Sequence, residues 1–351
     1  MNFELKVRET LKVIDTDYQG NPSIKIICPK QNTGKNYRNK TTYSFNSMPK
    51  QDELTFQFIS KEHIEIIEKI KKTELFQTIK DLFIKSNNLN KIQLCFTLFS
   101  DKLNLIMQTP EEFINNILEH LNNSNIVSIY YRLYTEESKT KIDSKEIKQY
   151  PFNESKKLIE NILGIKLYLS PYTFSRINTD ISPKIYEDVL NNYNQSNNII
   201  LYGRDIYFLY KYLNKQQNLN SNPNSNTNPN ILGITHCKIT YNDIIEDENK
   251  FKSKIVYSEK KDYTKNLELN QLPKSTVILT AGRNGLSLDL IEYFLRQIEI
   301  LEIVYIACNR KSMSRDLGIL KNQFTLNKLV IIDEFPNTDY NNTILNLRRK
   351  T

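Results

Sequence analysis

The stretch from Ile303 to Thr338 constrains the fold most. It opens with Ile303–Ala307, a short apolar and β-branched run typical of a strand buried on both faces of a parallel sheet. The run ends at Cys308, and apolar residues then recur at helical spacing to Leu320, with Ser312 placed to cap the helix. Cys308 is therefore expected at the carboxyl end of a strand and near a helix N-terminus, where open α/β sheets place their chemistry. A buried structural cysteine is the alternative, and position alone does not separate the two.

The composition is that of a globular protein with a polar surface and room for two domains. The 351 residues are 39% hydrophobic and 25% charged, which is enough to bury a sizeable core. The net charge of +8 favours a polyanionic partner, with nucleic acid ahead of a membrane surface. A Lys-rich coding bias, visible also in the heavy use of Asn and Ile, would give the same charge without any ligand.

The cysteines and histidines show no metal-binding pattern. Cys28, Cys95, Cys237 and Cys308 are far apart and form no CxxC pair, and the three histidines do not cluster. This spacing is typical of a reduced compartment and predicts no metal site. No apolar run reaches transmembrane length, and the first residues resemble neither a signal sequence nor a transit peptide. We expect a cytoplasmic monomer with no membrane association.

The chain divides into two regions with different patterns. Residues 1–152 mix amphipathic helical segments with antiparallel-looking strands, which indicates an α+β unit. In this region Ser23–Cys28 is expected to be a strand with Thr41–Phe45 returning beside it. Ile92–Phe99 and Asn104–Met107 are expected to form a hairpin.

Residues 153–351 alternate short buried strands with amphipathic helices, the pattern of a doubly wound, Rossmann-like α/β domain. Asn214–Asn230 interrupts this alternation with a low-complexity stretch that has almost nothing apolar to bury, so we expect a disordered insertion. The expected elements are Lys166–Ser170, Ile185–Tyr193, Asn198–Tyr202, Ile231–Thr235, Thr276–Thr280, Leu288–Ile298, Ile303–Ala307, Met313–Leu320 and Leu329–Ile332.

Three stretches, taken in order, carry a family resemblance. The first is the basic turn Tyr37–Lys40, and the second is Leu169–Thr179. The third is a series of four short motifs, Gly282–Leu286, Ala307–Asn309, Ser314–Leu317 and Phe335–Thr338. In this order and spacing they resemble the RNA (uracil-5-)-methyltransferases, which make 5-methyluridine in tRNA or rRNA. The resemblance implies a Rossmann-like methyltransferase domain over residues 153–351, preceded by an RNA-binding region over residues 1–152.

The resemblance also implies a specific chemistry. A thiolate adds to carbon-6 of uracil, the enolate takes the methyl group of S-adenosylmethionine, a base removes the carbon-5 proton, and the thiolate leaves. The target base must be flipped into the pocket. Cys308 matches the nucleophile. Tyr37, Arg38 and Lys40 match the RNA-binding turn, with a ring for stacking and cations for phosphates. Arg283 is expected to contact the uracil or the RNA backbone.

Other family positions hold different residues. Asn342 stands where the family has its glutamate base. The cofactor turn keeps one glycine, Gly203, and the acidic residue that holds the ribose hydroxyls aligns with Thr235. Thr280 replaces the start of an Asp-Pro-Pro segment, and Arg176 replaces a glutamine. These are the positions at which the resemblance implies the base and the cofactor contacts.

Two functions remain open on this basis. The first is an RNA (uracil-5-)-methyltransferase-like protein that acts on tRNA or rRNA through Cys308. The second is a non-catalytic RNA-binding pseudo-methyltransferase, a chaperone or assembly factor. A closed pocket at the substituted positions favours the second, and an open cleft with Asp339 or Asp333 near Cys308 favours the first. A third interpretation is an α/β protein that is basic through codon bias alone.

Overall fold

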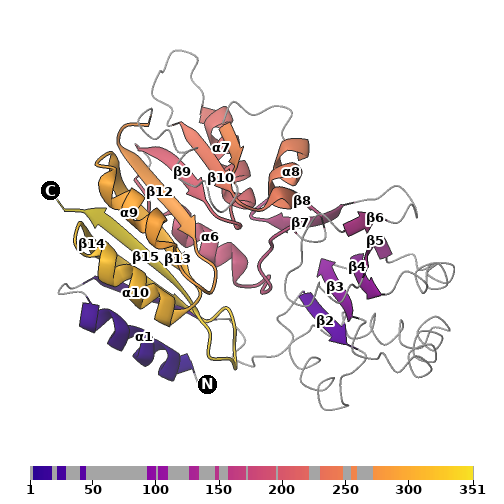
Figure 1. The fold of residues 1–351 in the computed structure, drawn as a ribbon, viewed down its shortest axis with the longest axis horizontal. Coiled ribbons are helices and arrows are strands. Elements are labelled where there is room, and N and C mark those ends of the chain that lie inside the picture. Colours follow the sequence, from indigo (N-terminus) through magenta and orange to yellow (C-terminus); the bar gives the residue numbers. More distant parts are fainter. Residues whose placement is uncertain are drawn as a thin grey trace. The chain divides into compact units, whose positions relative to one another are not determined.

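A computed structural model gives the structure of the chain (Figure 1). It describes residues 3–17, 22–28, 40–44, 93–99, 102–109, 126–133, 147–149, 157–170, 173–194, 197–220, 230–247, 254–258 and 272–350. Tyr37 and Arg38 of the predicted RNA-binding turn lie outside these ranges, and only the backbone of Lys40 is described. Internal contacts divide the chain into two compact units, Met1–Thr33 with Ile162–Ile165 and Asp180–Thr351, and Gly34–Asn161 with Lys166–Thr179.

The first unit is built on an eight-stranded sheet in the order β1-β14-β15-β13-β12-β9-β10-β11. Neighbouring strands are parallel except at β15, which is antiparallel to both β13 and β14. The order reverses at β9, which pairs with β10 on one side and β12 on the other. The predicted doubly wound, Rossmann-like fold is confirmed. The strands are β1 (Ser23–Ile27), β9 (Asn198–Tyr202), β10 (Ile231–Thr235), β11 (Lys254–Tyr257), β12 (Ser275–Thr280), β13 (Ile300–Ala307), β14 (Phe324–Ile332) and β15 (Asn342–Arg349).

Helices cover this sheet, and two of them frame the site. Figure 1 shows α9 and α10 on the near side of the strands, with α1 beside α10 and α6 behind the strands. The helices are α1 (Phe3–Asp17), α6 (Ser182–Leu190), α7 (Tyr207–Asn220), α8 (Lys238–Asp247), α9 (Leu288–Arg296) and α10 (Arg310–Leu320). α9 begins where the sequence predicts because Ser287 caps it, accepting a hydrogen bond from the Leu290 N–H.

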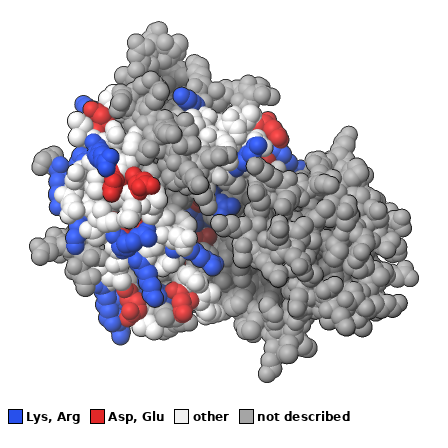
Figure 2. Space-filling view, viewed as in Figure 1, with Lys and Arg blue, Asp and Glu red and all other residues white. Residues whose placement is uncertain are grey.

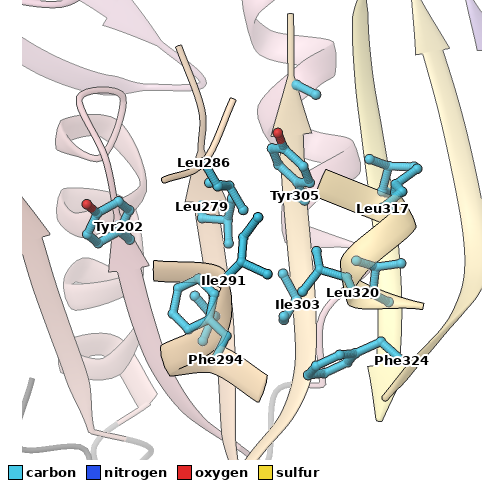
Figure 3. Close-up of a cluster of buried hydrophobic side chains, with 14 of the residues drawn as sticks. Tyr202, Leu279, Leu286, Ile291, Phe294, Ile303, Tyr305, Leu317, Leu320 and Phe324 are labelled. Atoms are coloured by element: carbon cyan, nitrogen blue, oxygen red, sulfur yellow. The ribbon is translucent and has the colours of Figure 1, made fainter. Parts of the chain in front are cut away.

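The core lies between the strands and α9 and α10. The apolar faces of the two helices pack against the central strands, and the side chains labelled in Figure 3 are all buried. Figure 3 shows Ile291 and Phe294 of α9 and Leu317 and Leu320 of α10 beside Ile303 and Tyr305 of β13. Burial of these large side chains fixes α10, and so the segment that precedes it, against the end of β13.

The first strand of the chain joins this sheet, which corrects two expectations. β1 pairs in parallel with β14, from Ser23 with Lys328 to Ile27 with Ile332. The expected return of Thr41–Phe45 beside it is wrong, because that segment forms β2 and pairs with β3. The contact boundary also differs from the expected boundary after residue 152, since residues 1–33 group with the large sheet.

The Asn-rich stretch begins as helix. α7 extends from Tyr207 to Asn220, so the first part of the expected disordered insertion, residues 214–220, is helical. Asn214 is buried, and its Nδ2 donates to the Tyr210 carbonyl at 2.8 Å. Asparagine is only a weak helix breaker, and no proline occurs before Pro223, so the helix started by Tyr207–Leu213 continues. Residues 221–229 of the insertion lie outside the described residues.

The second unit contains a five-stranded sheet in the order β2-β3-β4-β5-β6. The expected hairpin of β3 and β4 is confirmed, and β5 adds in parallel to β4. Lys166–Ser170 belongs to a two-stranded sheet of β7 and β8, joined by a turn at Leu163-Gly164 with positive φ at both residues. The strands are β2 (Lys40–Ser44), β3 (Gln93–Phe99), β4 (Lys102–Thr109), β5 (Ile126–Leu133), β6 (Ile147–Gln149), β7 (Leu158–Ile162) and β8 (Ile165–Leu169).

Candidate active site at the carboxyl end of the central strands

Cys308 lies directly after β13, at the end of the strand where the sequence predicts it. The thiol is half-buried, and its Sγ is 3.9 Å from the carbonyl oxygen of Ala281, the residue after β12. Asn309 is the N-cap of α10, with extended backbone and an Oδ1 that accepts from the Lys311 N–H at 3.0 Å. Ser312 was expected to cap this helix, which is wrong, because the asparagine amide already satisfies the first-turn donor and the helix starts at Arg310.

The turn after β12 is tied to the start of α10. The carbonyl oxygen of Arg283 accepts two hydrogen bonds, from Asn309 Nδ2 at 2.8 Å and from Ser312 Oγ at 3.1 Å. The Arg283 side chain is exposed, and its guanidinium lies over the ring of Tyr340, 4.9 Å from the centroid. Arg283 is therefore brought to the same site as Cys308.

A buried carboxylate fixes this turn from below. Asp316 of α10 has no exposed surface, and its Oδ2 accepts from the Tyr305 hydroxyl at 2.7 Å and from the Leu286 N–H at 2.8 Å. Its Oδ1 accepts from Arg315 Nε at 2.9 Å, and the two side chains form an ion pair. Burial, and then the Asp316 carboxylate, raise the pKa of Tyr305 well above its ordinary value. A Cβ at Gly285 would lie 2.5 Å from Asp316 Oδ2, so the close approach requires a glycine.

Asn342 faces Cys308 across two strand ends. Ala307 of β13 pairs with Thr343 of β15, and Cys308 and Asn342 are the next residues along each strand. The two positions that the resemblance assigns to the nucleophile and the base are therefore neighbours in the strand register. Asn342 is buried, and its amide cannot accept the carbon-5 proton.

The carboxylates considered as replacement bases are placed differently. Asp339 is exposed in the loop that follows β14. Asp333 is buried and paired with Lys6 of α1, whose Nζ lies 2.7 Å from Asp333 Oδ1 and also donates to the Phe335 carbonyl. Lys6 has no exposed surface, so this is a buried ion pair that fixes the loop. Burial, and then Asp333, raise the pKa of the Cys28 thiol at the end of β1.

Two of the residues predicted to contact the cofactor, Gly203 and Thr280, lie where the strand order reverses, between β9 and β12. Gly203 follows β9 with a φ of 128°, and a Cβ there would collide with Thr280 Oγ1 and lie 2.7 Å from the Thr280 carbonyl oxygen. Thr280 Oγ1 also accepts from the Asp205 N–H at 3.4 Å. Asp205 is buried, with Oδ1 2.5 Å from the Tyr186 hydroxyl of α6. The ends of β9 and β12 are thus packed directly against each other.

The remaining predicted cofactor residues are also buried. Thr235, at the end of β10, has no exposed surface, and its Oγ1 accepts from the Cys237 N–H at 3.2 Å. Its side chain therefore closes the local turn. Arg176 is 5% exposed and belongs to the other unit.

The Lys and Arg side chains form no single basic patch on the described surface seen in Figure 2. In Figure 2 the Lys and Arg side chains of the large unit are spread over the face, with Asp and Glu between them. In the described parts of the chain, no group of three or more His, Cys, Asp or Glu residues is arranged to hold a metal ion. No helix in those parts combines the length and apolarity needed to cross a bilayer.

Sequence comparison with known proteins agrees with these motifs. Residues 234–350 match the family model described as tRNA (Uracil-5-)-methyltransferase, and this segment holds Thr280, Arg283, Cys308 and Asn342. The C-terminal third of the chain is thus similar to the RNA (uracil-5-)-methyltransferases. An uncharacterized RNA methyltransferase of Fusobacterium nucleatum is 23% identical over 280 residues, which are 78% of this chain and 56% of that protein. The chain thus spans about half the length of this relative.

Two further comparisons give one more sequence relative and one solved structure. A putative 23S rRNA (uracil(747)-C(5))-methyltransferase of Haemophilus ducreyi is 34% identical over 84 residues, covering 24% of this chain and 38% of that one. The crystal structure of Pyrococcus abyssi tRNA (uracil-54, C5)-methyltransferase, in complex with S-adenosyl-L-homocysteine, superposes with a TM-score of 0.70. It covers 98% of this chain and 81% of the other at 15% identity, so it shows the shared fold.

Tyr340, Lys6 and Asp316 are the parts of the site that sequence reasoning did not bring together. The sequence gives a signal for Tyr340 in its place between the Phe335–Thr338 motif and Asn342, two residues from each. Lys6 gave no signal, because a lysine in an amphipathic helix normally points to solvent.

Proposed function

We propose that the chain is an RNA (uracil-5-)-methyltransferase-like protein that takes a uridine of tRNA or rRNA at Cys308. The observation that carries this proposal is the half-buried Cys308 between the end of β13 and the N-terminus of α10, with exposed Arg283 beside it. A position directly before a helix N-terminus is one at which proteins place nucleophilic cysteines. Addition of the Cys308 thiolate to carbon-6 of uracil moves the carbon-5,6 electron pair toward the carbonyl oxygen at carbon-4. Arg283 supplies a cation on this side of the site.

S-adenosylmethionine is the methyl donor that this chemistry requires. The family position that should hold its ribose is Thr235, whose side chain is buried and bonded to its own turn. At the glycine turn, Thr280 occupies the space beside Gly203. These residues do not fit the donor as the family's residues would, so the methyl-transfer half of the reaction is not assigned to them.

A second candidate follows from the packed ends of β9 and β12. It is a non-catalytic RNA-binding pseudo-methyltransferase, in which Cys308 and its surroundings serve only to hold RNA. The residues Tyr37, Arg38 and Lys40 are proposed RNA contacts under both candidates. Both rest on the same fold, and they differ in whether Cys308 reacts.

The test combines calorimetry with covalent trapping. Wild type and Cys308→Ser are titrated with S-adenosylmethionine and incubated with 5-fluorouracil-substituted tRNA and rRNA fragments, with and without the donor. A denaturation-resistant adduct that needs Cys308, together with donor binding, supports the methyltransferase. RNA binding without an adduct and without donor binding supports the pseudo-methyltransferase. Absence of RNA binding would refute both.

A further inference from the structure

Tyr340 is an exposed aromatic ring beside the nucleophile. Its side chain is 41% exposed, in a loop whose next two residues, Asn341 and Asn342, are buried. The ring carries the Arg283 guanidinium 4.9 Å from its centroid. A ring and a guanidinium plane in contact are the two kinds of surface on which proteins stack unpaired RNA bases.

The ring is held in the same rigid frame as Cys308 through two separate connections. On one side, the Arg283 carbonyl is hydrogen-bonded by Asn309 and Ser312 at the start of α10, next to Cys308. On the other side, Tyr340 lies two residues before Asn342, which faces Cys308 across β13 and β15. The Tyr340 N–H donates to Thr338 Oγ1 at 3.2 Å, and that hydroxyl donates to the Phe335 carbonyl at 2.8 Å. The loop is thus ordered before any ligand arrives.

We infer that Tyr340, with Arg283, is the stacking shelf for the base next to the target uridine in single-stranded RNA. This inference rests on the proposed function, because it places RNA at Cys308. When the uridine is flipped out toward the thiol, its neighbour loses its stacking partner, and the Tyr340 ring replaces that partner. The adjacent guanidinium then lies within reach of the intervening phosphate.

The experiment measures single-stranded RNA binding by fluorescence anisotropy. The probes are 12-nucleotide RNAs with one uridine among purines, and a matched set in which one nucleotide beside the uridine is abasic. Tyr340→Ala should weaken binding of the intact RNA by about 5-fold to 100-fold. Tyr340→Phe, which keeps the ring, should bind like wild type. On the RNA that is abasic at the stacked position, wild type and Tyr340→Ala should bind equally.

Charge variants provide the second arm. Arg283→Ala should reduce the slope of log affinity against log salt by about 0.7 for a single-stranded RNA, as expected for one lost phosphate contact. The matched control is Arg296→Ala, an exposed arginine of α9 that pairs with Glu292 and should leave the slope unchanged. Thermal unfolding of each variant is measured in parallel to confirm the fold.

Each outcome decides the inference. If Tyr340→Ala loses the same affinity for intact and abasic RNA, Tyr340 has a structural role. If it loses no affinity, Tyr340 is not part of the RNA-binding surface. Failure of the wild type to bind any probe would overturn the shelf and the proposed function together. Base-dependent binding through Tyr340 without a Cys308 adduct would leave the shelf standing and refute the covalent chemistry. A Cys308 adduct together with unchanged RNA binding by Tyr340→Ala would support the covalent chemistry and refute the stacking shelf.

Discussion

The proposed nucleophile half and the proposed cofactor half of the site lie along one edge of the same sheet, but they present different surfaces. Around β13 and α10, the thiol of Cys308 is half-buried and the side chains of Arg283 and Tyr340 are exposed, on a backbone held by hydrogen bonds. Around β9, β10 and β12, Asp205 and Thr235 are buried and engaged within the protein. A shared fold can therefore keep the framework of one half of a reaction while the residues of the other half turn to packing.

The largest expected effect is on covalent trapping. Cys308→Ser should abolish the adduct with 5-fluorouracil RNA, because a serine hydroxyl is too weak an acid to form the attacking anion. The measurement is a denaturing gel with mass spectrometry of the trapped peptide. Cys28→Ser is the control, since burial and Asp333 raise the pKa of the Cys28 thiol and it should not react. An adduct that persists in Cys308→Ser would show that another residue reacts, and the difference drawn between the two halves of the site would no longer hold.

The stability of the protein should be sensitive to added side-chain volume at Gly203, in the proposed cofactor half of the site. Gly203→Ala should destabilise the protein by about 3 kcal/mol, since the new Cβ meets Thr280 and the backbone has positive φ. Gly164→Ala is the matched control, because Gly164 also has positive φ but has no atom within 4 Å of a Cβ. It should cost about 1 kcal/mol, measured by urea denaturation. Equal costs at both positions would mean that the ends of β9 and β12 are not packed together.

The buried Tyr305–Asp316 pair beneath the Cys308 site should make the free energy of unfolding depend on pH in the alkaline range. The unfolded chain releases the Tyr305 proton near pH 10, whereas the folded protein retains it because the pKa of Tyr305 is raised by burial and by Asp316. The free energy of unfolding should therefore fall as pH rises above 10, by up to about 1.4 kcal/mol per pH unit from this group. Tyr305→Phe should remove this part of the slope.

This measurement needs a second tyrosine as its control. Burial raises the pKa of Tyr193 to about 12, so Tyr193 contributes to the same fall between pH 10 and 12. Urea denaturation of wild type, Tyr305→Phe and Tyr193→Phe at pH 8 to 12 separates the two. If Tyr305→Phe follows the wild-type curve, the phenol is not buried against Asp316 and the turn at Leu286 is held by something else.

The smallest effect concerns the cap of α10. Asn309→Ala should cost about 1 kcal/mol, because it removes the acceptor for the Lys311 N–H. Asn309→Asp keeps that acceptor and loses the donor to the Arg283 carbonyl, so it should cost less while loosening the turn that carries Arg283. Chemical denaturation and salt-dependent RNA binding report the two effects. A larger loss of stability in Asn309→Asp than in Asn309→Ala would contradict this division.

Much of the large sheet was predictable because its strands are short, apolar and β-branched. β9 and β10 have the expected bounds, and β12 and β13 extend theirs only at the start. β15 was missed because polar residues surround its short apolar runs, Ile344-Leu345 and Leu347. Asn342, Thr343 and Asn346 are nevertheless buried, for a reason the sequence does not reveal. Asn346 Nδ2 donates to Glu302 Oε1 at 2.8 Å, and Thr276 Oγ1 donates to Oε2 at 3.1 Å, so β15 joins the sheet through a buried polar network.

The site was predictable where a motif sits at a strand end and not where distant segments meet. Cys308 and Arg283 follow strands β13 and β12, and the order of the sheet brings the two ends together. The role of Lys6 depends on a tertiary contact with Asp333 from the far end of the chain. The closure of the glycine turn by Thr280 depends on side-chain volume at the meeting of two strands, which no local pattern encodes.

The pairing of β1 with β14 sets the order in which the chain can fold. Ser23 of β1 pairs with Lys328 of β14, so this edge of the large sheet can form only after nearly the whole intervening sequence has been synthesised. Contacts of such high sequence separation form slowly, because the entropy of closing the loop is lost before the pairing is gained. The unit formed by residues 34–161 and 166–179 is complete well before that point. During synthesis it can fold first, while the strand that precedes it remains unpaired and open to association with other chains.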